Sequence, residues 1–279
     1  MLQVLMKRGR AFTCLGLTNL NLMVVKLNDS LFDVTGKVIF VAGGACGLGS
    51  ALSHELALRG AHITIADRLP EQGQQVLKSL PGKGHSFLKL DVTNYESVES
   101  AIDDTRARLG RIDVLLNSAG IANIEPAHTL SVEDFEKTMA VNVTGAFALS
   151  KAAGRVMQQQ GEGRIIHLSS VSSRVVNKNY AAYSSSKAAL SQLVKILALE
   201  WATQGITVNA IGPAMTQTPM TERQLMASPD DRERALKKIP IGRFGTPEDL
   251  FGVTLLLASA AGAFITGQTI FVDGGRTLL

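Results

Sequence analysis

The chain has 279 residues, 46% of them hydrophobic and 19% charged, which is enough to bury one extended α/β core. Most of its formal charge of +4 comes from residues 1–30, so the near-neutral remainder does not predict a nucleic-acid-binding surface. Two cysteines and five scattered histidines exclude a disulfide framework and a zinc motif of ordinary spacing, and we expect no metal and a reducing, cytoplasmic setting.

The N-terminal segment is expected to be an extension of the fold. Residues 1–30 are predicted to be disordered, with translation from Met23 as the alternative. Within them, residues 11–25 are moderately apolar but too short and too polar to span a bilayer, so no membrane helix is predicted.

From Lys37 onward, short β-branched runs alternate with longer helical stretches, which predicts βαβ units and a parallel sheet. Strands are expected at 38–42, 62–66, 86–90, 114–116, 164–168, 207–211 and 269–272, and helices at 47–60, 95–109, 131–159, 181–204 and 247–259. The predicted fold class is α/β: residues 31–279 form a single Rossmann domain with a doubly wound, seven-stranded parallel sheet and helices on both faces. Residues 214–245 form a long connection that is expected to cover a substrate.

A glycine-rich turn follows the first expected strand and opens a helix. Its sequence is Gly43-Gly44-Ala45-Cys46-Gly47-Leu48-Gly49-Ser50. Such glycines let backbone N–H groups approach a pyrophosphate at the positive end of the helix, so we expect dinucleotide contacts at Gly43, Gly47, Leu48 and Gly49. A tight turn that binds nothing is the alternative. An NTP-hydrolysing loop is disfavoured because Ser50 occupies the position of its lysine.

An acidic residue follows at the end of the second expected strand. Asp67 can accept hydrogen bonds from the adenosine ribose, and its charge would repel the extra phosphate of NADP. This predicts NAD as the cofactor. Arg68 is the conflicting residue, because a guanidinium beside the ribose could accommodate a phosphate.

Tyr183 and Lys187 are spaced so that their side chains share one face of an expected helix. A nearby ammonium favours the phenolate and is expected to lower the pKa of Tyr183. The phenol could then exchange a proton with an alcohol or a carbonyl while a cofactor moves the hydride. For two residues alone, an accidental pairing on an exposed helix is the stronger reading.

Further motifs favour a catalytic pairing of Tyr183 and Lys187 over an accidental one. With these motifs, the sequence resembles the short-chain dehydrogenase/reductase family from about Leu31 to the end. These motifs are Asp91-Val92, Asn117-Ser118-Ala119-Gly120, Val141-Asn142-Val143, Ser170 upstream of Tyr183, Asn209-Ala210-Ile211-Gly212-Pro213, Arg243-Phe244-Gly245-Thr246-Pro247-Glu248, and Thr266-Gly267-Gln268 to Asp273-Gly274-Gly275.

The resemblance implies specific roles for residues of this chain. It implies a catalytic set of Asn142, Ser170, Tyr183 and Lys187, in which Asn142 holds a water linked to the lysine. It implies cofactor contacts from Asp91, Val92, Asn117, Ala119, Gly120, Tyr183, Lys187, Pro213, Thr216 and Thr218. Ser118 and Ala214 depart from the family pattern, and Ala214 makes the contacts of Thr216 and Thr218 with the nicotinamide carboxamide less secure.

The resemblance also suggests a substrate class. The stretch from Leu31-Phe32-Asp33 to Gly36-Lys37, together with Glu200-Trp201-Ala202, resembles sugar-acid and polyol dehydrogenases such as gluconate 5-dehydrogenase. This implies hydride transfer between NAD(H) and a secondary alcohol or ketone. A 3-oxoacyl-carrier-protein reductase is the alternative, and an NAD-binding redox sensor without turnover is the alternative from a different class. A serine hydrolase is disfavoured because the chain has no G-x-S-x-G motif. The resemblance also implies a homotetramer built through 131–159 and 181–204, with a homodimer as the alternative, and no nucleic-acid or membrane partner is expected.

Overall fold

The computed structural model describes residues 30–219, 221 and 229–279. The extension predicted at 1–30 therefore lies outside the described residues, apart from Ser30. Across the described ranges, none of the helices combines the length and the hydropathy that crossing a membrane requires.

A parallel sheet with the strand order β3-β2-β1-β4-β5-β6-β7 forms the centre of the molecule, which confirms the predicted fold class. Its strands are β1 (Val38–Ala42), β2 (His62–Asp67), β3 (Ser86–Lys89), β4 (Val114–Asn117), β5 (Gly163–Leu168), β6 (Ile206–Pro213) and β7 (Thr269–Val272). Val41 of β1 pairs with Ile65 on one side and with Leu116 on the other. The chain winds outward from β1 to β3 and then returns to β4, so the winding reverses between β1 and β4, where a ligand crevice is expected.

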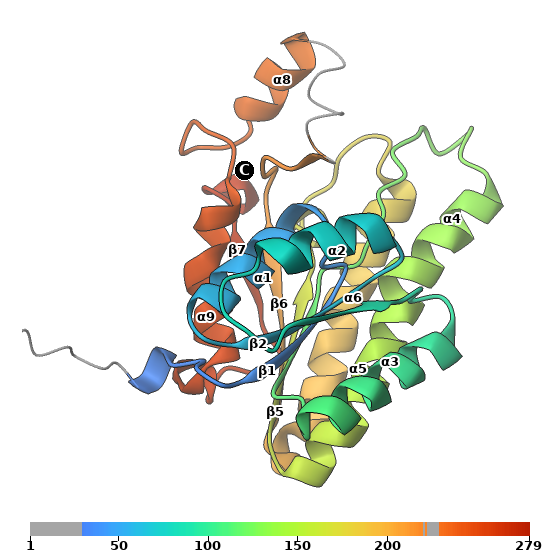
Figure 1. The fold of residues 1–279 in the computed structure, drawn as a ribbon. Helices are drawn as coiled ribbons and strands as arrows, with labels where there is room; N and C mark the ends of the chain where they lie inside the picture. The colour runs from blue at the N-terminus through green and yellow to red at the C-terminus, as the bar shows by residue number, and fades with distance from the viewer. Residues whose placement is uncertain (1–29, 220, 222–228) are drawn as a thin grey trace, which may run out of the picture.

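Helices cover both faces of this sheet (Figure 1). Their bounds are α1 (Gly47–Leu58), α2 (Pro70–Ser79), α3 (Tyr95–Leu109), α4 (Val132–Met139), α5 (Gly145–Gln160), α6 (Ala181–Trp201), α8 (Pro229–Leu236) and α9 (Phe251–Ala258). Local signals explain their ends: the Asn94 side chain accepts a hydrogen bond from the backbone N–H of Ser97 to start α3, and Gly110 ends it in the left-handed conformation.

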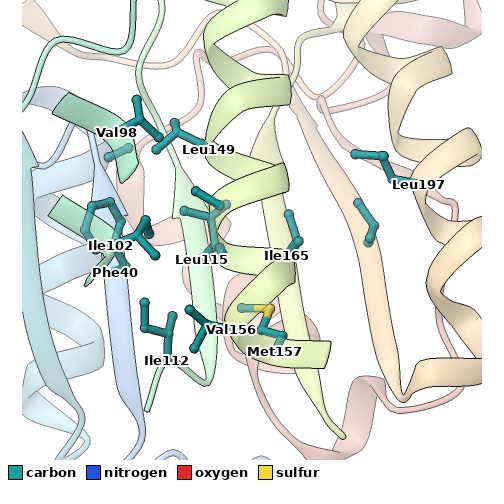
Figure 2. Close-up of a cluster of buried hydrophobic side chains, with 14 of the residues drawn as sticks. Phe40, Val98, Ile102, Ile112, Leu115, Leu149, Val156, Met157, Ile165 and Leu197 are labelled. Atoms are coloured by element: carbon teal, nitrogen blue, oxygen red, sulfur yellow. The ribbon is translucent and has the colours of Figure 1, made fainter. Parts of the chain in front are cut away.

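The core divides into two layers, one on each face of the sheet. The α3, α5 and α6 face buries a cluster that contains Phe40 of β1 beside Ile102 of α3, together with Leu149 and Met157 of α5 (Figure 2). The opposite layer packs α1 and α9 against the sheet through Leu52, Leu56, Ile63 and Leu257. Because every residue of β1 is buried, the strand is apolar throughout, as expected for a sheet covered on both faces.

The helix predictions need correction. The helix predicted at 131–159 is interrupted by a π-helical turn at Ala140–Thr144, which separates α4 from α5. A single hydrophobic period over the whole segment does not reveal such an insertion. The helix α2 was not predicted, although Pro70 at its first turn is a recognised start signal. The predicted helix at 247–259 is present but begins as a 3-10 turn at Pro247–Leu250.

Candidate active site

The glycine turn lies at the carboxyl end of β1 and leads into α1. A Cβ on Gly43 would lie 2.5 Å from the backbone N of Ala119, and one on Gly49 would lie 2.0 Å from the carbonyl O of Gly43, so both positions exclude a side chain. Gly47 has a φ of +56° and faces open space, with the Thr218 Cβ at 3.9 Å from the position of its missing Cβ. No side chain caps the N-terminus of α1. The turn thus leaves backbone N–H groups available to a phosphate, which fits a dinucleotide.

Asp67 lies at the end of β2, beside this turn, and is nearly buried. Its Oδ2 accepts a hydrogen bond from the Ala45 backbone N (3.0 Å), and its Oδ1 accepts one from the Leu69 backbone N (3.1 Å). A carboxylate has about four acceptor positions, so it retains the capacity to accept further bonds from ribose hydroxyls. The residue therefore has a structural role in holding the turn, in addition to the predicted cofactor contact.

Asp91 and Val92 follow β3 on the same side of the crevice. Val92 is buried, whereas Asp91 is exposed and accepts hydrogen bonds from the backbone N (2.9 Å) and Oγ1 (2.7 Å) of Thr93. These bonds, together with the positive charge of Arg68, lower the pKa of Asp91. The exposed Arg68 thus lies within electrostatic range of the predicted adenine site.

A buried hydrogen-bond relay supports the loop that contains Asn117, Ala119 and Gly120. The Asn117 Oδ1 accepts from the Ala119 backbone N (3.1 Å), and its Nδ2 lies 3.1 Å from the Nδ1 of His167. The Nε2 of His167 lies 3.0 Å from the Ser150 Oγ, which donates its own proton to the Ala146 carbonyl O (2.7 Å). These partners require a neutral imidazole that carries its proton on Nε2. Burial accordingly lowers the pKa of His167 to about 3.

Asn142 lies in the π-helical turn and is fully buried. Its Nδ2 donates to the Ile121 carbonyl O (2.9 Å) and to the Ser186 Oγ (2.9 Å), while its Oδ1 accepts from the Ile121 backbone N (2.8 Å). Its amide therefore ties the segment after β4 to α6. A Cβ on Gly120 would lie 3.3 Å from the Asn142 Oδ1 and 3.4 Å from the Lys187 Nζ, so these three residues meet at one point.

Ser170, Tyr183 and Lys187 are brought together at the carboxyl end of β5. Ser170 follows β5, and its Oγ accepts from the Ser172 backbone N (3.1 Å). Tyr183 and Lys187 lie on the first turns of α6, with the Lys187 Nζ 5.7 Å from the centre of the Tyr183 ring. The buried Lys187 Nζ donates to the Leu168 carbonyl O (2.8 Å).

The prediction that Lys187 lowers the pKa of Tyr183 is wrong for the protein without ligands. Burial raises the pKa of this phenol, Tyr180 raises it further, and only a hydrogen bond with Ser170 acts in the opposite direction. The physical reason is desolvation, which penalises the charged form of both groups. The same burial lowers the pKa of Lys187 to about 8.

A pocket of about 990 Å³ opens above these residues. Ser170 and Tyr183 lie in its wall, together with Tyr180, whose ring centre is 6.0 Å from that of Tyr183. Residues of the 214–245 connection also line it, including Ala214, Met215 and the C-terminal half of α8. The C-terminal tail contributes Arg276.

The loop after β6 closes the other side of the crevice. Pro213 ends β6 opposite Val272, and both Thr216 and Thr218 are buried in the loop that follows. The Thr216 Oγ1 donates to the Ala214 carbonyl O (3.0 Å), and Thr216 forms an isolated bridge with Gly245. The position of Thr218 near Gly47 shows that this loop and the glycine turn face each other across the crevice.

Sequence reasoning missed Arg276, Lys238 and Tyr180 as pocket residues, and His167 as the support of Asn117. Tyr180 directly precedes the helix that carries Tyr183, and its nearness to Tyr183 in the sequence is the signal that could have found it. Arg276 and Lys238 are distant from Tyr183 along the chain, and no local pattern marks either of them. Among the described residues, no cluster of three or more histidine, cysteine or acidic side chains could bind a metal ion.

The fold and site geometry define a dinucleotide-binding oxidoreductase, and comparison with known proteins identifies its family. A family model described as enoyl-(acyl carrier protein) reductase matches residues 34–277. The chain belongs to the short-chain dehydrogenase/reductase family, whose members use NAD(P). It is an oxidoreductase that acts on CH–OH groups.

The chain is similar to several characterised relatives over nearly its whole length. It is 37% identical to a D-threitol dehydrogenase of Mycolicibacterium smegmatis, covering 90% of this chain and 96% of the relative. It is 34% identical to an NAD-dependent glycerol dehydrogenase of Listeria innocua (92% and 100%) and 36% identical to the 3-oxoacyl-[acyl-carrier-protein] reductase of Escherichia coli (88% and 98%).

Solved structures show the same fold. A crystal structure of a gluconate 5-dehydrogenase from Burkholderia cenocepacia in complex with NADP and tartrate superposes with a TM-score of 0.84 at 34% identity. The matched region covers 90% of this chain and 98% of that structure. The relatives therefore include polyol dehydrogenases, a sugar-acid dehydrogenase and an acyl-carrier-protein reductase.

Proposed function

We propose that this chain interconverts a secondary alcohol and a ketone of a polyol or sugar acid, with NAD(H) as the hydride carrier and Tyr183 as the proton-transfer residue. The observation that carries the proposal is the placement of Ser170 and Tyr183 in the wall of one large pocket, with the buried Lys187 behind them. A neutral phenol in that wall can donate a proton to a carbonyl oxygen, and a phenolate can accept one from an alcohol.

Each residue of the proposed catalytic set has a separate task. The bound nicotinamide would give or take the hydride at the substrate carbon. Ser170 would hydrogen-bond the reacting oxygen and hold it beside the Tyr183 hydroxyl. Lys187 would favour the phenolate during alcohol oxidation through its charge. Asn142 would act as a positioning residue, because its amide holds the segment beside Gly120 and the Lys187 side chain.

The cofactor would lie across the carboxyl ends of β1 and β4. Gly43, Gly47, Leu48 and Gly49 would hold its pyrophosphate, and Asn117, Ala119 and Gly120 would line the middle of the crevice. Pro213, Thr216 and Thr218 would contact its nicotinamide end. Asp91 and Val92 would contact the adenine. Asp67 supports NAD over NADP because a carboxylate beside the ribose repels a phosphate, although Arg68 lies next to it.

The substrate class rests on the relatives and on the pocket. Dehydrogenases of threitol, glycerol and gluconate are all similar to this chain, and one of the similar structures binds tartrate, a polyhydroxy acid. Residues 214–245 would cover the substrate, since α8 and the residues after it line the pocket. A 3-oxoacyl-carrier-protein reductase remains the second candidate, favoured by the similarity to the Escherichia coli enzyme.

Tyr183→Phe tests the proposed role of the phenol. We expect turnover to fall by at least about 100-fold, because the ring remains while the exchangeable proton is lost. Turnover is measured from NADH absorbance with panels of polyols, sugar acids and 3-oxoacyl thioesters, and NADH binding by calorimetry should remain within a few-fold of wild type.

The exposed Tyr95 of α3 offers a matched control. Tyr95→Phe should retain wild-type turnover. A Tyr183→Phe protein that still turns over, or one that loses NADH binding instead, would contradict the assignment. Binding of NADH without turnover of any substrate by the wild-type protein would favour a redox sensor.

A further inference from the structure

We propose that the substrate carries an anionic group, a carboxylate or a phosphate, and that Arg276 and Lys238 bind it next to Asn177. These three residues are called the anion seat below. This inference deepens the proposed function and rests on it for the position of the seat beside Tyr183. It turns the broad class of polyols and sugar acids into a specific preference for the charged members.

The charge of the pocket is the first observation. Five basic residues line it, and no acidic residue occurs among the described residues of its wall. They are Lys178, Arg234, Lys237, Lys238 and Arg276. The whole chain has 28 basic and 24 acidic residues, so this one-sided lining differs sharply from the average composition. A cavity lined by one sign of charge attracts ligands of the opposite sign.

The second observation is the pairing state of these cations. Lys237, directly after α8, forms an ion pair with Glu233 of that helix (2.8 Å between Nζ and Oε1), so part of its charge is balanced. Lys238 and Arg276 make no ion pair with any acidic group that the structure describes. Their positive charges are therefore available to a ligand.

Both cations converge on a single uncharged acceptor. The Lys238 Nζ and the Arg276 Nη2 each donate to the Asn177 Oδ1, and each distance is 3.4 Å. Like charges that share one neutral oxygen repel each other, and bonds of this length are weak. An anionic oxygen between them would reduce the repulsion and form shorter, charge-assisted hydrogen bonds.

Arg276 is held in place before any ligand arrives. It follows Asp273, whose Oδ1 accepts from the Gly275 backbone N (3.0 Å) and whose Oδ2 accepts from the Thr277 backbone N (2.8 Å). Asp273 directly follows β7, so this turn fastens the tail to the sheet. The Arg276 side chain is half-buried, which limits its screening by solvent. A pre-positioned guanidinium loses little conformational entropy when it binds an anion.

The position of Asn177 connects this seat with the chemistry. Asn177 lies on the loop between Ser170 and Tyr183, and all three residues line the same pocket. A substrate anchored at one end by the two cations could therefore present a CH–OH group to Tyr183. A neutral polyol would leave both cations without a counter-charge.

Three ligands that share one carbon skeleton test the inference: threitol, threonate and threitol phosphate. Calorimetry with the NADH-bound protein measures their affinities directly, without requiring turnover. We expect threonate or threitol phosphate to bind at least about tenfold more tightly than threitol, with the advantage decreasing as salt increases. The preferred anion identifies the group as a carboxylate or a phosphate. Equal affinities for the neutral and both charged ligands would overturn the inference.

Variants assign the effect to the seat. Arg276→Gln and Lys238→Gln should each reduce the affinity advantage of the preferred anion over threitol by about tenfold. Asn177→Asp places a carboxylate of the same shape between the cations and should weaken anion binding to a similar extent. The matched control is Lys78→Gln, which removes an exposed cation at the end of α2 and should leave anion binding unchanged.

The outcomes separate this inference from the proposed function. Anion selectivity that disappears in the seat variants supports the inference, whether or not any substrate is turned over. An absence of turnover would refute only the proposed function. Turnover with equal KM values for neutral and anionic substrates, unchanged in Arg276→Gln, would retain the proposed function and refute the anion seat.

Discussion

At the level of single residues, burial sets the protonation of this site more strongly than the neighbouring charges do. Lys187 and Tyr183 lie close together, yet desolvation lowers the pKa of the first to about 8 and raises that of the second. Both shifts favour neutral groups. The phenol is therefore held protonated at neutral pH in the unliganded protein, which is the form that can donate a proton to a carbonyl.

His167, which does not line the pocket, shows the same effect of burial and makes stability depend on pH. Its pKa is lowered to about 3, so the unfolded chain binds a proton below about pH 6.5 that the folded protein does not bind. The stabilising contribution of the neutral residue is fully present above that pH and is lost as pH falls from 6.5 toward 3. Between pH 7 and pH 5 the loss should be about 2 kcal/mol.

Urea unfolding at these two pH values tests the prediction. Between pH 7 and pH 5, the unfolding free energy should decrease for both proteins. The decrease should be about 2 kcal/mol smaller for His167→Asn than for the wild type, because the titrating group is absent. His167→Gln serves as a second variant if the first does not fold. Replacement of the exposed His54 by Asn should leave the wild-type pH dependence intact. Equal slopes for the wild type and both His167 variants would show that the imidazole does not remain neutral.

Asp67 combines a structural task with the predicted choice of cofactor. Asp67→Asn removes the charge but keeps a carbonyl oxygen that can accept one of the two backbone bonds from Ala45 and Leu69. We expect the ratio of kcat/KM for NAD to that for NADP to fall by at least about tenfold, because the repulsion of the ribose phosphate is lost. Steady-state kinetics with both cofactors measure this ratio. An unchanged ratio in a folded variant would disprove the contact with the ribose.

At the level of elements, the turn between β1 and α1 depends on close backbone approach. Gly49→Ala would place a Cβ 2.0 Å from the Gly43 carbonyl O, and the turn would have to open. We expect NADH affinity to fall by at least about tenfold, since the N–H groups at the helix N-terminus would be displaced. Calorimetric titration with NADH measures the loss.

A second glycine provides the control for this element. Gly252 lies on α9, and a Cβ there would meet no atom within 4 Å. Gly252→Ala should keep wild-type NADH affinity and increase the unfolding free energy by up to about 1 kcal/mol, because alanine favours the helix. If both variants bind NADH equally well, the turn is not the phosphate site.

The π-helical turn at Ala140–Thr144 has a role in the site that its local sequence pattern does not indicate. The π-helical turn separates α4 from α5 at the position of Asn142. There the buried amide binds Ile121 and Ser186, which belong to two different segments of the chain. Helix termination and site assembly are therefore coupled through one side chain.

At the level of the whole molecule, large apolar side chains remain exposed on the helices expected to form an assembly. Phe147 of α5 is 45% exposed, and Ile196 and Leu199 of α6 are 46% and 82% exposed. Exposed apolar side chains on adjacent helices are typical of protein interfaces. We therefore keep the prediction of a homotetramer built through these helices.

Light scattering coupled to gel filtration tests the assembly. The wild type should elute as a tetramer, and Leu199→Glu should shift it toward smaller species, because a charge would be buried in the interface. Val176, also exposed but located on the pocket loop, gives the control Val176→Glu, which should remain tetrameric. A monomeric wild-type protein would refute the prediction.

The family resemblance supplied Ser170, and the sequence alone determined the fold class, the positions of the strands and the motif residues around Gly43, Asp67 and Tyr183. These follow from local signals, because period, glycine placement and spacing act within one element or between neighbouring ones. Only the tertiary structure decided that Arg276 and Lys238 meet at Asn177, that His167 supports Asn117, and that Tyr183 is desolvated enough to raise its pKa. Such properties depend on which distant segments share one environment, and burial and charge convergence have no signature in a local stretch of sequence.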